Sequence, residues 1–175
     1  MHIKNTLTEY GLISKLLHWI SAALLFAQIP LGFYLVDLDF GLERISLENI
    51  HITVGLSIFY LVILRLIYKL FNPTPKLDPS IFKGQRFLAK LNHVMLYVTI
   101  LSITISGIFK KLLNGETLTI VFKKIKIQDN FQLSELFYDV HVFSNYLLIV
   151  LIAIHLMAII THKLFFKDNL LKKML

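Results

Sequence analysis

Residues 140–166 have the sequence VHVFSNYLLIVLIAIHLMAIITHKLFF, an apolar stretch long enough to cross a lipid bilayer, and it contains His141 and His155 fourteen residues apart. A bilayer span needs about 20 mostly apolar residues in helical form. An imidazole in hydrocarbon is unfavourable unless it is bonded or paired, so histidines inside a span are candidates for a functional site. This stretch therefore indicates a membrane protein with a role for its buried histidines.

Three further stretches share this apolar character, and the whole chain is 56% hydrophobic with a mean hydropathy of +0.69. Such a composition excludes an ordinary soluble domain. Because lipid offers the backbone no hydrogen-bond partners, each span should be helical, and the short connections favour an antiparallel bundle. We therefore predict an all-α membrane protein, a single domain over residues 1–175 with four transmembrane helices at about 16–36, 51–71, 87–109 and 140–166.

The sequence argues against a secretory signal peptide and against any site that depends on cysteine. The first span follows Lys4 and Lys15, as in a secretory signal peptide, but it is too long for a signal sequence and no small-residue cleavage site follows it. Cysteine is absent, which excludes disulfides, Cys-ligated iron–sulfur clusters and haem attached through a Cys-x-x-Cys-His motif. Any haem bound by this chain should therefore be b-type, held by ligation and packing.

Lysine and arginine in the connections indicate the orientation of the chain. The first connection carries four acidic residues against Arg44 alone, whereas the second connection and the C-terminal tail are rich in lysine. Both termini should therefore be cytoplasmic, which agrees with four spans. The third connection does not follow this rule, because it would place five lysines on the far side of the membrane: Lys110, Lys111, Lys123, Lys124 and Lys126.

Helix geometry restricts which histidines can meet. An α-helix rises about 1.5 Å and turns about 100° per residue, so His141 and His155 lie about 21 Å apart along nearly the same face. His51 opens the second span on the outer side, where the fourth span begins with His141. His18 enters from the cytoplasmic side at about the depth of His155. The sequence thus predicts two pairs, His51 with His141 and His18 with His155, while His93 competes with His18 at its depth.

Haem iron suits such pairs better than zinc. Two imidazoles facing each other provide the two axial positions of a haem, whereas structural zinc usually needs four ligands at one point. The carboxylates and thiols that would complete a zinc site are missing from the spans. Small residues follow these four histidines one turn along the same helix, as a porphyrin would need: Ser21 and Ala22, Gly55, Ser144 and Ala158. For each single histidine, the alternative to haem ligation is a structural hydrogen bond to a neighbouring helix.

At these residues the chain resembles the bacterial cytochrome b561 family, whose members are di-haem proteins of the inner membrane. The likeness is an ordered set of motifs: Leu17-His18-Trp19, Ile50-His51 through Gly55, Arg65 with Asn72-Pro73-Thr74-Pro75, Asn92-His93 through Tyr97, the His141 and His155 spacing, and Phe166 to Leu171. The resemblance implies two haem b groups, one ligated by His18 and His155 and the other by His51 and His141. Val140 and Val142 depart from the family pattern, which often has an aromatic and an acidic residue there.

The resemblance also implies a function. Family members pass electrons between haem b and the quinone pool, and some oxidise superoxide on the outer side to reduce ubiquinone. Iron with two axial histidines has no open position, so we expect no catalytic residue at an open metal site. We therefore expect an oxidoreductase or electron carrier of the bacterial inner membrane that links superoxide, or another periplasmic donor, with quinone.

Two alternatives stay open. One is a haem-bearing anchor that relays electrons for a partner dehydrogenase or hydrogenase, and the other is a membrane scaffold or transporter without redox function. The expected partners are quinone, superoxide and the lipid bilayer, and we expect no nucleic-acid partner.

Three further features each have two interpretations. Arg65 either provides a counter-charge to a haem propionate or extends to the lipid headgroups. His162, two turns beyond His155, either exchanges a proton with a quinone head group or is an interfacial histidine without redox role. The lysines of the third connection either steer a small anion toward the outer haem or belong to a solvated amphipathic loop.

Overall fold

The computed structural model describes residues 2–75, 82–120, 122–165 and 174. In these ranges the chain forms four long helices and one short antiparallel hairpin: α1 (Leu12–Asp37), α2 (Leu42–Phe71), α3 (Lys83–Leu113), β1 (Leu118–Ile120), β2 (Lys123–Ile125) and α4 (Phe131–Phe165). All four helices are long and apolar enough to cross a membrane. The predicted all-α membrane fold with four spanning helices is confirmed.

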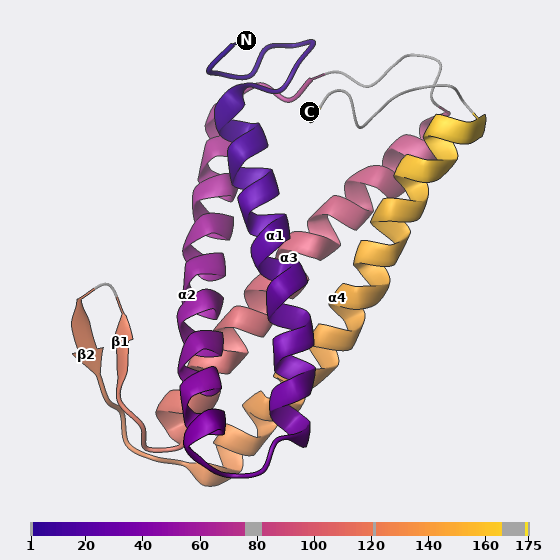
Figure 1. The fold of residues 1–175 in the computed structure, drawn as a ribbon. Coiled ribbons are helices and arrows are strands. Elements are labelled where there is room, and N and C mark those ends of the chain that lie inside the picture. Colours follow the sequence, from indigo (N-terminus) through magenta and orange to yellow (C-terminus); the bar gives the residue numbers. More distant parts are fainter. Residues whose placement is uncertain (1, 76–81, 121, 166–173, 175) are drawn as a thin grey trace.

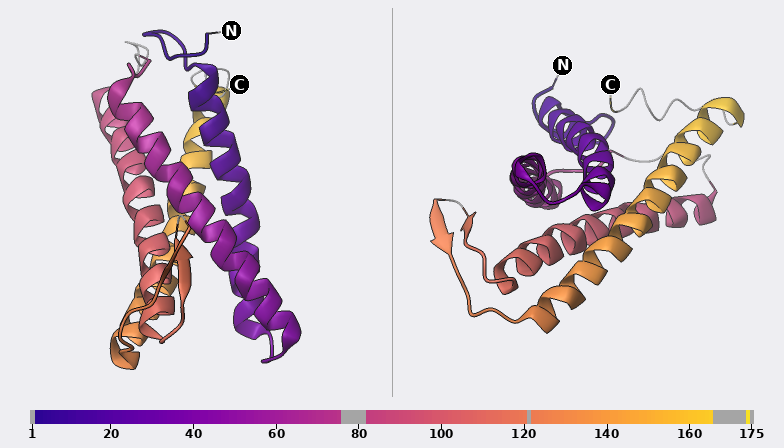
Figure 2. Two further views of the ribbon diagram at one scale, coloured as in Figure 1. Left: turned by 90° about the vertical axis from the view of Figure 1, so that its left-hand side faces the viewer. Right: turned by 60° about the horizontal axis from the view of Figure 1, so that its bottom comes forward.

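The helices form two antiparallel pairs. Helix α1 packs against α2 and α3 packs against α4, while α2 also contacts α3 (Figures 1 and 2). The N-terminus and the C-terminal end of α4 lie at one end of the bundle, which we call the terminal end (Figure 1). The α1–α2 connection and the hairpin lie at the other, which we call the hairpin end. The chain thus enters and leaves on the same side of the bundle.

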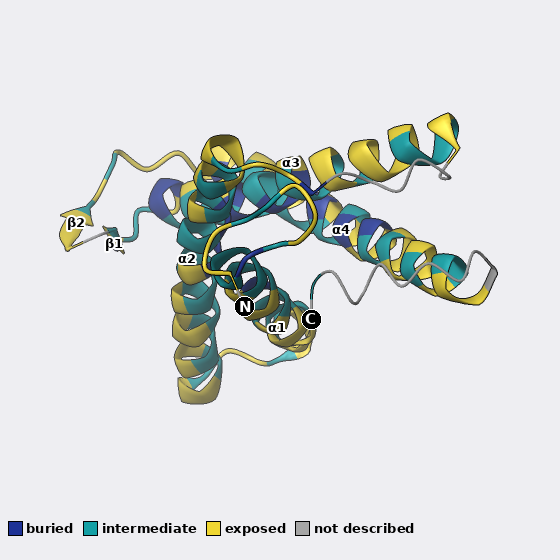
Figure 3. Ribbon diagram, turned by 90° about the horizontal axis from the view of Figure 1, so that it is seen from above, coloured by how far each residue is buried: buried dark blue, intermediate teal, exposed yellow. Residues whose placement is uncertain are grey.

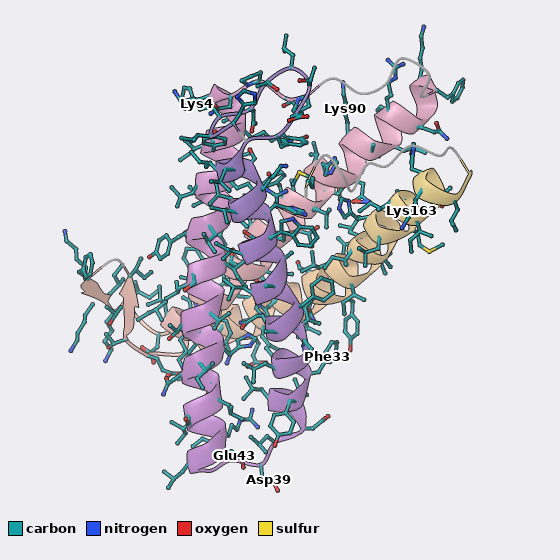
Figure 4. All side chains as sticks on the ribbon, turned by 45° about the horizontal axis from the view of Figure 1, so that its top comes forward. Lys4, Phe33, Asp39, Glu43, Lys90 and Lys163 are labelled. Atoms are coloured by element: carbon teal, nitrogen blue, oxygen red, sulfur yellow. The ribbon has the colours of Figure 1, made fainter. Side chains whose placement is uncertain are left out.

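Charge differs between the two ends. Figure 4 shows Lys4, Lys90 and Lys163 toward the terminal end and Asp39 and Glu43 at the hairpin end. The exposed lysines at the terminal end and the acidic α1–α2 connection are the asymmetry that sets orientation in a membrane.

The helices are longer than the predicted spans. Helix α2 begins nine residues before position 51 and α4 nine residues before position 140. Asn130 explains where α4 begins, because its Oδ1 accepts a hydrogen bond from the Leu133 backbone N–H at 3.0 Å, as a helix N-cap does. Residue 166, where the fourth span was predicted to end, and the motif from Phe166 to Leu171 lie outside the described residues.

The hairpin follows a turn that glycine makes possible. Gly115 follows Asn114, the C-cap of α3, and has φ +82°, a left-handed conformation typical of the residue after a helix C-cap. Phe122, between the two strands, has φ +113° and is 98% exposed. The sequence predicts only a loop in this region, because strands of three residues are too short to produce a recognisable alternation of apolar and polar residues.

The buried core is small and lies in the middle of the bundle. It consists of Ile58 and Val62 of α2, Ile100 of α3 and Leu148 of α4, with apolar residues of α1 packed against it. Most other residues are exposed or half-buried (Figure 3). This distribution suits a bundle whose apolar outer surface faces lipid, where helices pack through small and hydroxyl residues. One example is Ser102 of α3, whose hydroxyl lies 3.0 Å from that of Ser144 in α4.

The segment before α1 is tied down by Asn5. Its Oδ1 accepts hydrogen bonds from the Gly11 backbone N–H at 2.9 Å and from the Ser14 hydroxyl at 2.8 Å. Its Nδ2 donates to the Pro73 carbonyl at 3.1 Å, just beyond α2. Asn5 therefore joins the start of α1 to the exit of α2 at the terminal end.

Candidate functional site

At the hairpin end, His51 of α2 and His141 of α4 face each other. Their ring centroids are 6.2 Å apart, with an angle of 63° between the ring planes. A metal–imidazole bond is about 2 Å long, so two such bonds on opposite sides of one metal, plus half of each ring, span about this separation. The distance between the rings therefore fits two axial ligands of a single metal ion.

The hydrogen bonding of His141 also fits ligation. Its Nδ1 lies 2.8 Å from the carbonyl oxygen of Ile103 in α3. A carbonyl can only accept a hydrogen bond, so Nδ1 carries the proton and Nε2 keeps its lone pair. Metal-binding histidines are commonly oriented in this way, with the second ring nitrogen donating to a carbonyl.

Glycines of neighbouring helices leave room for both rings. A Cβ atom on Gly32 of α1 would lie 3.3 Å from Cε1 of His51, and one on Gly107 of α3 would lie 3.2 Å from Cε1 of His141. Neither glycine was predicted, because only small residues on the same helix as each histidine were considered in the sequence. Gly32 and Gly107 instead contact the rings from adjacent helices, and sequence spacing within one helix carries no signal of such contacts.

Two histidines have a buried nitrogen without a partner. Nδ1 of His18 and Nδ1 of His51 make no hydrogen bond to any described part of the chain. A buried polar atom left without a partner costs about 1–3 kcal/mol. Ligation of a metal through Nε2 puts the ring proton on Nδ1, where it needs an acceptor from the protein, so these Nδ1 atoms do not themselves mark the metal position; haem b is the group that the histidine pairs fit best.

At the terminal end three histidines come together. The rings of His155 and His93 have centroids 5.4 Å apart, and His18 lies within electrostatic reach of both. His93 is exposed, whereas His18 and His155 are half-buried. His155 is therefore near both of its candidate partners, and the pairing of His18 with His155 stays a prediction.

Two cations lie beside this histidine cluster. The Arg65 guanidinium carbon is 5.5 Å and the Lys69 Nζ is 5.0 Å from the ring centroid of Tyr97. Arg65 is also within electrostatic reach of His18 and His155. No described carboxylate forms an ion pair with either cation. Two positive charges over one aromatic ring suit a nearby anionic group such as a haem propionate.

Tyr10 covers this region from the segment before α1. Burial raises the pKa of the Tyr10 hydroxyl, and this increase is opposed by the positive charge of Arg65. The N-terminal segment thus contributes to the surroundings of Arg65 and Tyr97 at the terminal end.

An apolar layer separates the two histidine groups. Leu148 is buried and lies seven residues from both His141 and His155, and it packs with Ile58, Val62 and Ile100. Among the described residues, no three His, Cys, Asp or Glu side chains gather into a site that could hold a bare metal ion. The arrangement is two histidine sites at opposite depths.

The basic residues of the third connection have different surroundings. Lys111 forms ion pairs with Glu48 of α2, at 3.6 Å, and with Glu116, at 2.5 Å. Lys110 lies within electrostatic reach of His51 and His141. The three lysines of the hairpin region are all exposed to solvent: Lys123, Lys124 and Lys126.

His162 lies in the last turn of α4, at the terminal end, and is half-buried. This position is near the membrane interface at the end opposite to the hairpin. Its suggested contact with quinone stays a prediction.

The chain is similar in sequence to known membrane cytochromes. The sequence profile of prokaryotic cytochrome b561 matches residues 9–175. The chain is 26% identical over 180 residues to cytochrome b561 homolog 2 of Escherichia coli strain K12, covering 100% of this chain and 95% of that protein. It is 27% identical over 132 residues to a probable superoxide oxidase of Yersinia pestis, covering 74% of each chain. Because the profile match includes all four helices and both histidine groups, the chain belongs to the prokaryotic cytochrome b561 family of membrane haem b proteins.

Proposed function

We propose that this cytochrome holds two b haems, one at each end of the bundle, and carries electrons across the bacterial inner membrane between a periplasmic donor such as superoxide and the quinone pool. The observation that carries the proposal is the presence of histidine groups at both ends, separated by the apolar layer around Leu148. The two groups suit a path for electrons from one side of the membrane to the other.

The four proposed ligands act in two pairs. His51 and His141 hold the haem at the hairpin end, and His18 and His155 hold the haem at the terminal end. A haem held by two imidazoles supplies one-electron transfer without an open position for substrate. The Ile103 carbonyl keeps the proton of His141 on Nδ1, so that Nε2 can bind iron.

The residues around the pairs support this use. Gly32 and Gly107 let the rings of the hairpin-end pair lie close to α1 and α3. Arg65, together with Tyr97, provides a cationic surface for a propionate at the terminal end.

The charge asymmetry supports the orientation. The terminal end carries the exposed Lys4, Lys90 and Lys163, whereas the hairpin end carries the acidic α1–α2 connection beside the lysines of the third connection. Because the other regions outweigh the third connection, we assign the terminal end to the cytoplasm and the hairpin end to the periplasm. With this orientation, His51 and His141 form the periplasmic haem site and His18 and His155 the cytoplasmic one.

The electrons lost by superoxide equal those gained by quinone when two superoxide anions react for each quinone. Two superoxide anions each lose one electron and leave as O₂, and one quinone takes up both electrons with two protons to become quinol. The relative named as a probable superoxide oxidase supports this donor. The exposed Lys123, Lys124 and Lys126 give the hairpin end a positive surface that attracts a small anion. His162 is suited to proton exchange with quinone near the cytoplasmic interface.

The proposal is tested with purified protein in quinone-containing liposomes, supplied with superoxide from an enzymatic generator. We expect superoxide to reduce the haems and quinol to accumulate, with both signals abolished by superoxide dismutase. The variant His51→Ala should lose quinol formation. Haems that superoxide fails to reduce, but that a co-purifying dehydrogenase or hydrogenase reduces, would favour the anchor-subunit alternative.

A further inference from the structure

Gln28 is a polar residue in the middle of α1, surrounded in sequence by Leu24, Leu25, Phe26, Ile29 and Pro30. A side-chain amide at this depth has no water to bond to, so it is unfavourable unless the protein supplies partners. Its Nε2 donates a hydrogen bond to the backbone carbonyl of His51 in α2, at 2.7 Å. Gln28 is therefore bonded to the very residue that we propose as a haem ligand.

Two complementary atoms are left over at this contact. Oε1 of Gln28 and Nδ1 of His51 are both buried, and neither has a hydrogen-bond partner in the described part of the chain. An amide oxygen only accepts hydrogen bonds. When Nε2 of a neutral imidazole binds a metal, its proton is on Nδ1, which then needs an acceptor. The free acceptor is Oε1 of Gln28, and the nitrogen that needs an acceptor is Nδ1 of His51. These two residues are already joined by the hydrogen bond from Nε2 of Gln28.

The ring of His51 is turned so that its Nδ1 side faces α1. A Cβ atom on Gly32 would lie 3.3 Å from Cε1 and 3.9 Å from Nδ1 of this ring. Gly32 follows Gln28 by four residues, one helical turn, so both residues lie on the same face of α1. The Nδ1 edge of His51 therefore points toward the face of α1 that carries Gln28.

The partner histidine shows the same arrangement with its bond complete. A Cβ atom on Gly107 of α3 would lie 3.2 Å from both Cε1 and Nδ1 of His141. Four residues before this glycine, Ile103 accepts the Nδ1 hydrogen of His141 on its main-chain carbonyl, at 2.8 Å. Helix α1 repeats the pattern of an acceptor followed by glycine four residues later. In α1 the acceptor is the side-chain carbonyl of Gln28.

We propose that Gln28 is the positioning residue for His51. Its Nε2 holds the α2 backbone at the ligand, and its Oε1 accepts the Nδ1 hydrogen of His51. The inference rests on the proposed function, because it takes His51 as a haem ligand. An acceptor on Nδ1 makes the imidazole a stronger electron donor, which favours oxidised iron and lowers the midpoint potential.

The test is a redox titration of purified Gln28→Leu, with haem content and low-temperature electron paramagnetic resonance measured on the same samples. We expect the midpoint potential of one haem to shift upward and its resonance to move, while the second haem keeps its wild-type values. Gln28→Glu retains the Oε1 acceptor but loses the Nε2 donor to the His51 carbonyl, so a potential at or below that of the wild type in this variant would assign the shift in Gln28→Leu to the lost acceptor. Gln85→Leu, in the first turn of α3 at the opposite end of the bundle, is the matched control and should change neither haem.

Each other outcome has a defined meaning. Unchanged potentials in Gln28→Leu, or equal shifts of both haems, would overturn the role of Gln28 while leaving the di-haem proposal intact. If Gln28→Leu loses one haem, retention of the second haem with its wild-type potential supports a local effect on His51, and loss of both haems would overturn it. Wild-type protein without two haems would contradict the proposed function itself and this inference with it.

Discussion

His51 and His141 each lie against a glycine of a neighbouring helix, so the space around the proposed ligands is set by residues that carry no side chain. At both positions a Cβ atom would contact the imidazole ring at 3.2 or 3.3 Å, closer than ordinary van der Waals contact. Glycine in a helix interior is less favourable than alanine by about 0.5–1 kcal/mol. Its presence at both positions is therefore explained by the rings it accommodates.

We predict that Gly107→Val weakens haem binding at the hairpin end. The new side chain must displace the ring of His141, and overpacking of this kind typically costs about 1–3 kcal/mol, which corresponds to about 5- to 150-fold in affinity. Haem per chain after purification and dilution measures the effect. Gly41→Val is the control, since a Cβ atom there has no described atom within 4 Å. Full retention of both haems by Gly107→Val would contradict this packing argument.

The four proposed ligands give a second prediction. His51→Ala or His141→Ala should remove the hairpin-end haem alone, and His18→Ala or His155→Ala the terminal-end haem alone. Each variant should thus keep about half of the wild-type haem, measured as the pyridine haemochrome. His93→Ala tests the assignment at the terminal end, because His93 lies beside His155. Normal haem content in His18→Ala with loss in His93→Ala would reverse the roles of these two histidines.

For single residues, the sequence was sufficient to predict the depth of each histidine in the bundle but not its contacts with neighbouring helices. The rise of a helix is fixed, so counting residues predicted that His51 and His141 would share a level. Which face of a helix contacts its neighbours depends on how all four helices pack together. The spacing of residues within one helix does not contain this information. The positions of Gln28 and Gly32 beside His51 could therefore be found only in the structure, whereas the depth of His93 was predicted from the sequence and the structure adds that its ring lies beside that of His155.

At the scale of elements, the ends of the helices are joined by polar contacts. Lys111, near the end of α3, pairs with Glu48 of α2, and only 13% of its side chain is exposed. We predict that Lys111→Gln destabilises the bundle by about 0.5–1 kcal/mol, the range for partly exposed ion pairs. Thermal release of haem at low and high salt measures this loss, which should shrink as salt increases because screening weakens the wild-type pair. Equal loss at both salt concentrations would contradict an electrostatic role.

The hairpin gives a prediction about the donor. Lys123 and Lys124 are exposed on β2, so replacing both with glutamate should slow haem reduction by superoxide about tenfold at low ionic strength. The difference from wild type should decrease with added salt. Lys90→Glu, toward the terminal end, is the control and should leave the rate unchanged (Figure 4). A rate insensitive to the β2 charges would favour the simpler interpretation of a solvated loop.

The elements themselves were predictable where the apolar signal was strong. All four spans were found from hydropathy and length, since lipid requires continuous apolar helices. The additional turns of α2 and α4 were missed because they contain charged residues, such as Glu43, Glu48 and Glu135. The hairpin was missed because its two strands have only three residues each.

At the scale of the whole molecule, the bundle has both described ends of the chain on one side (Figure 1). The absence of cysteine allows single cysteines to report on orientation. We predict that Phe122→Cys, at the exposed hairpin, reacts with a membrane-impermeant maleimide from the periplasm. Lys4→Cys should react only after the inner membrane is permeabilised. The opposite labelling pattern would invert the orientation and exchange the two haem sites.

The proposed function requires that this chain hold two b haems, one at each histidine group. The most direct measurement is a dithionite-reduced minus air-oxidised optical spectrum of the purified protein, with a pyridine haemochrome to count haem per chain. We predict a sharp b-type α-band and two haems per chain. One haem per chain, or a spectrum without an α-band after expression with ample haem, would contradict it.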